Sequence, residues 1–177
     1  MDFETLISER YSVRSFRSEH LPKDVIDKIL EAGHKAPTGC NYQPQRILVM
    51  NTDASIDKLQ KCTKCHFNAP TAMLVCHNKE ESWVRKYDGA CSSPVDAVIV
   101  TTYMMLAAQN EGVGACWVMH FDPFAMREAF RIPECVEPIA LLVMGYPSDD
   151  AKPLALHFEK RPIEETVFHE GFHEGRV

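Results

Sequence analysis

The chain has 177 residues and is 45% hydrophobic, which is enough for one domain with a real core and too little for two. Its formal charge of -6 at pH 7 argues against a broad surface for nucleic acid or anionic membranes. Any basic cluster is therefore expected to be local and to serve a small anionic ligand. We expect no signal peptide, and the most apolar run is shorter than the roughly 18 residues that a membrane span needs. A single cytoplasmic domain over residues 1–177 is predicted.

The seven cysteines are an odd number, which predicts reduced thiols rather than a disulfide framework. Cys62, Cys65 and Cys76 form a weak pattern for a zinc site or a redox pair, and buried thiols are the commoner explanation. Residues 169–173 match the H-E-x-x-H motif of zinc proteases, but Gly171 weakens the helix that this motif requires. We therefore predict no metal site.

The first quarter of the chain alternates between helical patterns and polar segments. Pro22 lies in the first turn of a helix whose apolar residues recur at helical spacing, and Gly33 is predicted to end it. In chain order we predict a helix over 2–9, a basic segment over 10–16, a helix over 21–32, a loop over 36–44 and a strand over 46–50.

The rest of the chain carries the more apolar elements. We predict a helix over 55–62, a strand over 71–77, a lid or crossing loop over 79–93, a helix over 94–111, a strand over 115–119, a helix over 122–130 and a strand over 138–145. The helix over 94–111 is apolar almost all round, which indicates burial on every side or against a second subunit. Residues 147–177 have little apolar periodicity and are predicted to form an arm on a partner subunit.

The segment Arg10-Tyr11-Ser12-Val13-Arg14-Ser15-Phe16 has the chemistry of a phosphate clamp. A phosphate prefers Arg forks, hydroxyl donors and free backbone N–H groups, and alternation places the basic side chains on one face. An edge strand with solvated arginines is the alternative for this segment alone.

Two further segments favour the clamp interpretation. The loop from Pro37 to Gln43 offers hydroxyl, amide and backbone groups to the edge of a heteroaromatic ring, and Lys160-Arg161 adds positive charge far along the chain. The three segments together are predicted to hold one flat, phosphorylated cofactor.

In this order of motifs the chain resembles the nitroreductase family of flavoenzymes, from Thr5 to about Val167. The resembling segments are Arg10–Phe16, Ile29–Gly33 with Ala36–Pro44, Leu106–Ala108 with Glu111–Trp117, Pro138–Leu142 with Gly145–Pro147, and Lys160–Glu165. The resemblance implies an α+β fold with a central, mostly antiparallel sheet flanked by helices. It also implies an entwined homodimer with two FMN sites at its interface.

The resemblance also implies which residues hold FMN. Arg10, Ser12 and Arg14 would hold the phosphate, Tyr11 would contribute main chain, and either Lys160 or Arg161 would complete the clamp. The segment expected to line the flavin ring comprises Pro37, Thr38, Gly39, Asn41 and Gln43, with Asn41 and Gln43 as its main polar contacts. Met119 or His120 would donate a backbone N–H to flavin N5.

The implied activity is electron transfer from NAD(P)H through FMN to a small aromatic acceptor, such as a nitroaromatic or a quinone. No side chain is assigned as a catalytic acid or base, because the flavin supplies the chemistry. Two alternatives remain: a specialised flavin enzyme with another electron donor, for example a dehalogenase, and a flavin-binding or electron-carrier protein without its own turnover. Gln45, where many relatives carry an aromatic residue, and the Cys- and His-rich segment 62–66 depart from the family pattern.

Overall fold

The computed structural model describes residues 1–172. Within them the chain forms five α-helices: α1 (Phe3–Glu9), α2 (Lys23–His34), α3 (Asp53–Cys62), α4 (Ser93–Asn110) and α5 (Pro123–Phe130). The strands of the same range are β1 (Gln45–Met50), β2 (Thr71–Asn78), β3 (Gly114–Val118) and β4 (Val136–Gly145). The predicted order of helices and strands is therefore confirmed, with bounds that move by at most two residues.

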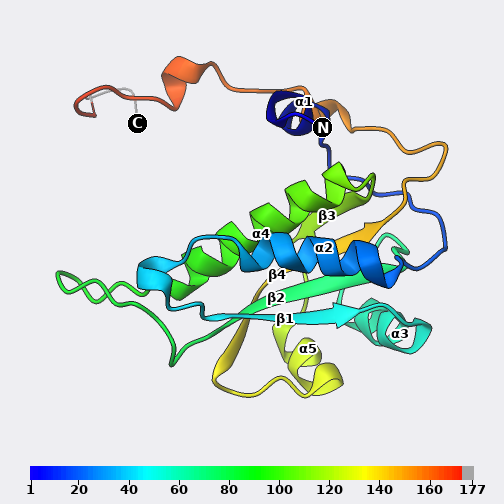
Figure 1. The fold of residues 1–177 in the computed structure, drawn as a ribbon, viewed down its shortest axis with the longest axis horizontal. Helices are drawn as coiled ribbons and strands as arrows, with labels where there is room; N and C mark the ends of the chain where they lie inside the picture. Colours follow the sequence, from blue (N-terminus) through cyan, green and yellow to red (C-terminus); the bar gives the residue numbers. More distant parts are fainter. Residues whose placement is uncertain (173–177) are drawn as a thin grey trace.

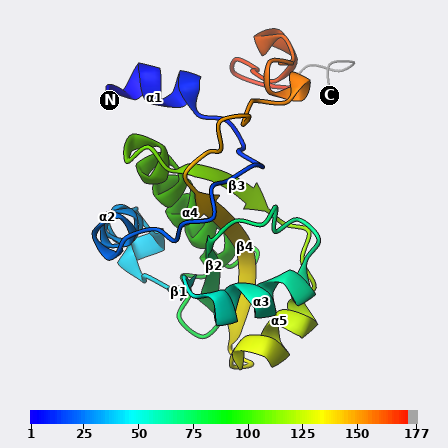
Figure 2. The ribbon, with the colours of Figure 1, turned by 90° about the vertical axis from the view of Figure 1, so that its right-hand side faces the viewer.

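The four strands form one sheet in the order β1-β2-β4-β3, and all neighbouring strands are antiparallel (Figure 1). Helices α2 and α4 cover one face of this sheet, and α3 and α5 cover the other (Figure 2). The central strands β2 and β4 are buried along nearly their whole length, which explains why their sequences are continuous apolar runs. The α+β prediction is confirmed.

Several helix ends follow directly from local sequence. The Asp2 carboxylate accepts a hydrogen bond from the Thr5 amide at the start of α1, and Asp122 accepts from two amides at the start of α5. Thr52 and Ser55 form a reciprocal capping box, which starts α3 two residues earlier than predicted.

The prediction that Gly33 ends its helix is wrong. Gly33 lies inside α2 and is buried, and a Cβ atom at this position would lie 2.7 Å from Cγ of Met104 in α4. The glycine therefore permits close packing of two helices instead of a chain reversal, a difference that depends on a partner 71 positions away.

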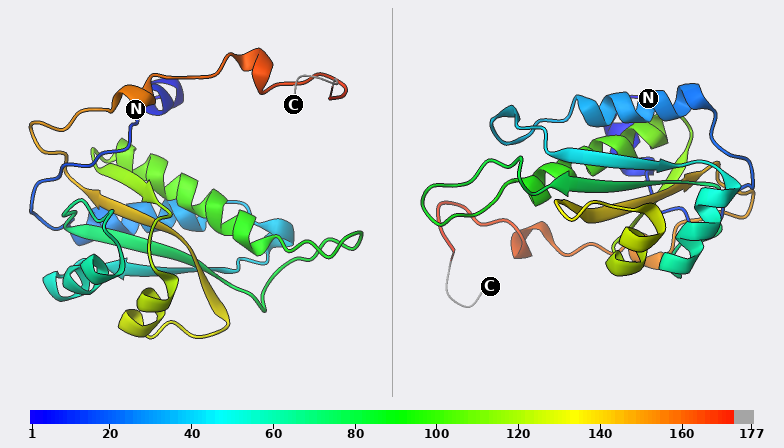
Figure 3. Two further views of the ribbon diagram at one scale, coloured as in Figure 1. Left: turned by 180° about the vertical axis from the view of Figure 1, so that it is seen from behind. Right: turned by 90° about the horizontal axis from the view of Figure 1, so that it is seen from below.

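A large apolar surface stays uncovered in the single chain. Val95 and Tyr103 of α4 are exposed, as are Leu156 and Phe158 of the C-terminal arm. As far as residue 172, the arm contains only two short 3-10 turns, η2 (Ala155–His157) and η3 (Ile163–Glu165), and it runs away from the sheet (Figure 3). Within residues 1–172 no helix is both long and apolar enough to cross a membrane.

Candidate functional site

The basic segment 10–16 runs beside the edge strand β3 without becoming a regular strand. Ser12 forms an isolated parallel bridge with Ala115, in which the Val13 amide donates to the Ala115 carbonyl at 3.1 Å. Val13 is buried against Gly114, whereas Ser12 and Arg14 are more exposed. The alternation expected from the sequence therefore exists, and it is held by one buried valine.

The two arginines of this segment are not neutralised by the protein. Among the described residues neither Arg10 nor Arg14 forms an ion pair, whereas the nearby Arg17 pairs with Asp149 at 3.0 Å. The Arg14 guanidinium donates to the Ser12 carbonyl at 3.0 Å and lies 5.8 Å from the ring centroid of Phe67. Unpaired guanidinium groups held in place in this way are suited to binding an anion.

The thiol of Cys116 in β3 shows that these groups converge. Burial raises the pKa of Cys116, while the charge of Arg14, a hydrogen bond with Ser12 and the charge of Arg10 act in the opposite direction. All three predicted phosphate ligands thus act on the pKa of one buried thiol, and the effect of burial is the largest.

A cavity of about 190 Å³ opens beside the clamp. It is lined by Tyr11, Ser12, Arg14, Leu154, Leu156 and His157. The rings of Tyr11 and His157 meet edge to face with centroids 6.4 Å apart. His157 could not be identified from the sequence, because no motif marks a single histidine in an irregular arm. Lys160 and Arg161 line a separate, more open hollow farther along the arm.

The segment after α3 contacts the basic segment, which the sequence did not reveal. Phe67, under the Arg14 guanidinium, and the following Asn68 have φ angles of 50° and 52°. Left-handed backbone costs energy in most residues and concentrates at functional sites. The Phe-Asn pair directly after the Cys- and His-rich segment 62–66 was the signal available in the sequence for a left-handed turn, since asparagine tolerates this conformation.

The predicted ring-lining loop is largely exposed and lies just before β1. The Gly39 amide donates to the buried carboxylate of Asp96 at 2.8 Å, and the Gln43 amide donates to the Thr38 hydroxyl at 3.1 Å. Asn41 and Gln43 have left-handed φ angles of 60° and 51° and are exposed, and Pro37 is exposed as well. The loop therefore presents its amides to the outside while its backbone is anchored to α4.

The loop and the clamp lie at opposite ends of the same sheet. Ala115, beside the clamp, is paired with Met144 of β4. Gln45, just after the loop, is opposite His77, which is in turn opposite Glu137 of β4. The seven residue-to-residue steps from Glu137 to Met144 span about 23 Å of extended strand. One chain therefore does not bring its own loop and its own clamp together.

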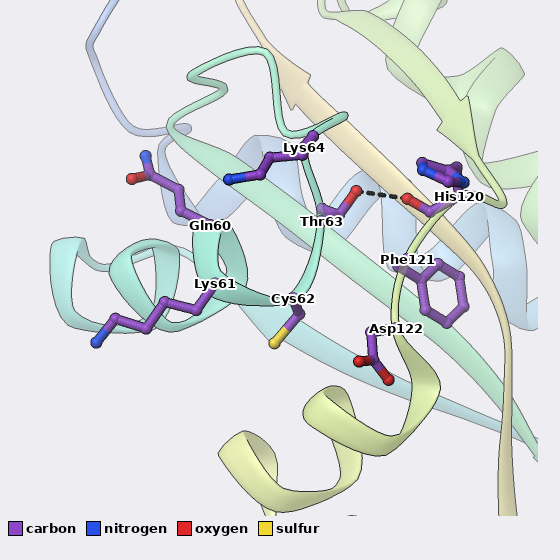
Figure 4. A pocket seen from close by; sticks show the side chains of 8 residues that line it. All are labelled: Gln60, Lys61, Cys62, Thr63, Lys64, His120, Phe121 and Asp122. Atoms are coloured by element: carbon purple, nitrogen blue, oxygen red, sulfur yellow. Dashed lines mark hydrogen bonds between the residues drawn. The ribbon is translucent and has the colours of Figure 1, made fainter.

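The turn after β3 is tied to the end of α3. The Thr63 hydroxyl donates to the His120 carbonyl at 2.5 Å, and the Asp122 amide donates to the Cys62 carbonyl at 2.8 Å. A cavity of about 330 Å³ lies between the two segments, as Figure 4 shows, and its lining comprises Gln60, Lys61, Cys62, Thr63, Lys64, His120, Phe121 and Asp122. Met119 and His120 are both exposed residues.

The cysteine and histidine patterns form no recognisable metal centre. Within residues 1–172 no group of three His, Cys, Asp or Glu side chains is arranged to hold a metal ion, and all seven cysteines are free. Burial raises the pKa of Cys76 to about 12, which keeps this thiol protonated. Residues 169–172 of the H-E-x-x-H match form no helix, and His173 lies outside the described residues.

Comparison with known proteins identifies the family. The model of the Nitroreductase family matches residues 7–91 and 66–146, which include the clamp, the loop and the turn. The chain belongs to the nitroreductase family. A nitroreductase family protein from Clostridium difficile 630 is 38% identical in sequence, with a TM-score of 0.90 over 97% of this chain and 100% of that one. Lys160 and Arg161 lie outside the two matched segments.

The names of two further relatives mention FMN and a nicotinamide nucleotide. A protein from Desulfovibrio desulfuricans, solved in complex with FMN, is 26% identical, with a TM-score of 0.77 over 96% of this chain and 97% of that one. A protein from Methanothermobacter thermautotrophicus is 28% identical over 90% of this chain and 88% of its own length. The name of the latter combines NADH dehydrogenase with NAD(P)H nitroreductase.

Proposed function

We propose that this member of the nitroreductase family is an FMN-dependent oxidoreductase that takes electrons from NAD(P)H and passes them to a small aromatic acceptor. The observation that carries the proposal is the pair of guanidinium groups of Arg10 and Arg14, which lie beside the Ser12 hydroxyl at the edge of β3 without a protein counter-ion among residues 1–172. A relative that binds FMN and a relative named for NAD(P)H support it.

The donors at the clamp match the phosphate of FMN. Arg10, Ser12 and Arg14 would hold the phosphate oxygens, and the main chain of Tyr11 would contribute beside the cavity. His157 lines the same cavity, and Lys160 or Arg161 would complete the clamp if the arm changed course on a partner. A phosphate requires hydrogen-bond donors and positive charge, and segment 10–16 has both.

The ring-lining loop would come from a second copy of the chain. Because the loop stands at the far end of the sheet from the clamp, a two-fold related copy is the simplest source of a loop beside each clamp. The exposed apolar residues of α4 and of the arm over 147–177 supply surface for such a homodimer. The domain would then span residues 1–177, with its arm packed on the partner.

FMN, when bound, supplies the hydride chemistry at its N5 atom. The protein would contribute the anchor for the phosphate, the walls around the ring and a backbone N–H from the turn at Met119 and His120. No side chain is required as an acid or base. A nitroaromatic or a quinone is the proposed class of acceptor, because a flat aromatic molecule can stack on the exposed face of the ring.

Spectroscopy of the purified full chain tests this function. The protein should be yellow, with one FMN per chain, and NADH or NADPH should bleach the flavin absorbance in the absence of oxygen. Addition of a quinone should restore the absorbance with turnover. An FMN-loaded dimer that neither nucleotide reduces would contradict the proposed donor.

A further inference from the structure

We infer that Thr63 is a positioning residue for the flavin, because its hydroxyl starts a hydrogen-bonded chain that ends at the backbone amide of His120. The inference rests on the proposed function, in which this turn faces N5 of FMN. It also selects His120 over Met119 as the donor, a choice that the sequence left open.

The hydroxyl of Thr63 is buried and acts both as a hydrogen-bond donor and as an acceptor. Thr63 directly follows α3 and is only 6% exposed. Its oxygen accepts a hydrogen bond from the Cys65 amide at 2.9 Å, and its proton is donated to the His120 carbonyl at 2.5 Å (Figure 4). An amide can only donate and a carbonyl can only accept, so the direction of both bonds is determined.

The chain continues through two peptide groups. The His120 carbonyl belongs to the same peptide as the Phe121 amide, and this amide donates to the Met119 carbonyl at 3.1 Å. The Met119 carbonyl in turn belongs to the same peptide as the His120 amide. Each hydrogen bond in such a series polarises the next, so the Thr63 hydroxyl strengthens the His120 N–H as a donor.

The same bonds determine where the His120 N–H points. In a planar trans peptide the N–H is directed opposite to the C=O. Because the Met119 carbonyl is turned toward Phe121, inside the turn, the His120 N–H is directed away from it. The bond from the Asp122 amide to the Cys62 carbonyl fixes the far side of the turn. The His120 amide is therefore oriented before any ligand arrives.

Thr63 also joins the two ends of the proposed flavin site. Through the Cys65 amide, its hydroxyl holds the start of the segment that leads to Phe67, beneath the Arg14 guanidinium. The phosphate clamp and the N5 donor are thus connected through one buried side chain. Loss of the hydroxyl would leave the His120 carbonyl without this partner and would weaken both the orientation and the strength of the donor.

Redox measurements on the FMN-loaded full chain test the inference. Thr63→Val removes the hydroxyl with little change of shape, and Thr63→Ser retains it. Thr101→Val is the matched control, since Thr101 is also buried and donates its hydroxyl to the Ala97 carbonyl at 2.7 Å, within α4. The readouts are the midpoint potential, the flavin absorption spectrum and the dissociation constant of FMN.

N5 accepts a hydrogen bond in oxidised FMN and carries the transferred hydrogen in reduced FMN, so the strength of a donor at N5 affects the two states differently. We expect Thr63→Val to change the ratio of reduced to oxidised FMN about tenfold, which is a shift of about 30 mV in the potential of a two-electron couple. The flavin spectrum should shift, and Thr63→Ser and Thr101→Val should match the wild type. A potential and spectrum of Thr63→Val equal to those of the wild type would overturn the inference, as would an equal shift in Thr101→Val.

The potential is measured with a chemical reductant, so this result does not depend on NAD(P)H turnover. Wild-type protein that binds FMN but is not reduced by either nucleotide contradicts the proposed donor and leaves the comparison of potentials valid. If Thr63→Val does not fold, Thr63→Cys replaces it, because a thiol is a weaker donor than a hydroxyl. A Thr63→Cys potential equal to that of Thr63→Ser would then overturn the inference.

Discussion

The polar and charged groups at the two ends of the sheet differ in whether they are paired within the protein. At the β3 end, Arg10 and Arg14 have no acidic partner among residues 1–172. At the β1 end, the Gly39 amide and the Ser92 hydroxyl both donate to the buried carboxylate of Asp96, at 2.8 and 2.9 Å. Within residues 1–172 the β3 end therefore carries positive charge without a counter-ion, whereas the carboxylate at the β1 end is hydrogen-bonded within the protein.

This difference indicates different contributions to a shared site. Guanidinium groups without an ion pair gain most from a charged ligand, because no acidic partner has to be displaced first. A loop whose backbone is anchored to a buried carboxylate gains little from charge, but it provides a wall of fixed shape. The phosphate would thus determine affinity at the first end, and the loop would shape the space around the ring at the second.

The largest expected effect is on cofactor binding at the clamp. Arg14→Ala removes a charge-assisted contact of about 1.5 to 3 kcal/mol, so the dissociation constant of FMN should rise about 10- to 100-fold. Fluorescence titration of the apoprotein measures it. Arg17→Ala is the control, because Arg17 is already paired with Asp149. If Arg14→Ala retains FMN with wild-type affinity, Arg14 is not in the clamp.

Asp96→Ala tests the anchored end. Loss of two hydrogen bonds to a buried carboxylate should lower the free energy of unfolding by about 1.5 to 3 kcal/mol. Urea denaturation of the apoprotein measures the change, and Asp96→Asn, which retains an acceptor oxygen, should lose less. The affinity for FMN should fall less than in Arg14→Ala. A variant as stable as the wild type would show that the loop does not depend on this anchor.

Gly114→Ala tests the support of the clamp. An added Cβ would lie 2.7 Å from Cγ2 and 2.9 Å from Cβ of Val13, so the segment between Ser12 and Arg14 must shift. Overpacking of this kind costs about 1 to 3 kcal/mol. Thermal unfolding should therefore occur at lower temperature and FMN should bind more weakly. Gly171→Ala, where no atom of the described residues other than its chain neighbours lies within 4 Å of the added Cβ, should leave both unchanged. Equal behaviour of the two variants would refute a tight contact with Val13.

The smallest effect concerns thiol reactivity at the two ends. Hydrogen bonds from Ser82 and Ser93 lower the pKa of the exposed Cys91, next to the loop, whereas burial raises the pKa of Cys116, next to the clamp. At a given pH near 8 a larger fraction of Cys91 is therefore thiolate, and iodoacetamide should label it several-fold faster. Mass spectrometry of the peptides measures both rates. Ser82→Ala should slow the labelling of Cys91. Labelling of Cys116 that is faster than that of Cys91 would contradict the predicted order of the two thiols.

Local patterns predicted most of the fold. The caps at Asp2 and Asp122 and the apolar runs of β2 and β4 follow from near neighbours in the chain, and the structure confirms them. Gly33 was misjudged because its role depends on Met104, far away in sequence. His157 was missed for the same reason, since only the course of the arm brings it to the clamp.

By itself, the sequence determined the helices and strands of this protein and the positive charge of its segment 10–16, because capping, strand period and side-chain charge act over a few residues. The tertiary structure decided which of these groups meet. The sheet register separates the loop from the clamp of its own chain, and packing after α3 brings Thr63 to His120. Such contacts join residues that are distant in sequence, and the packed fold is what brings them within bonding distance.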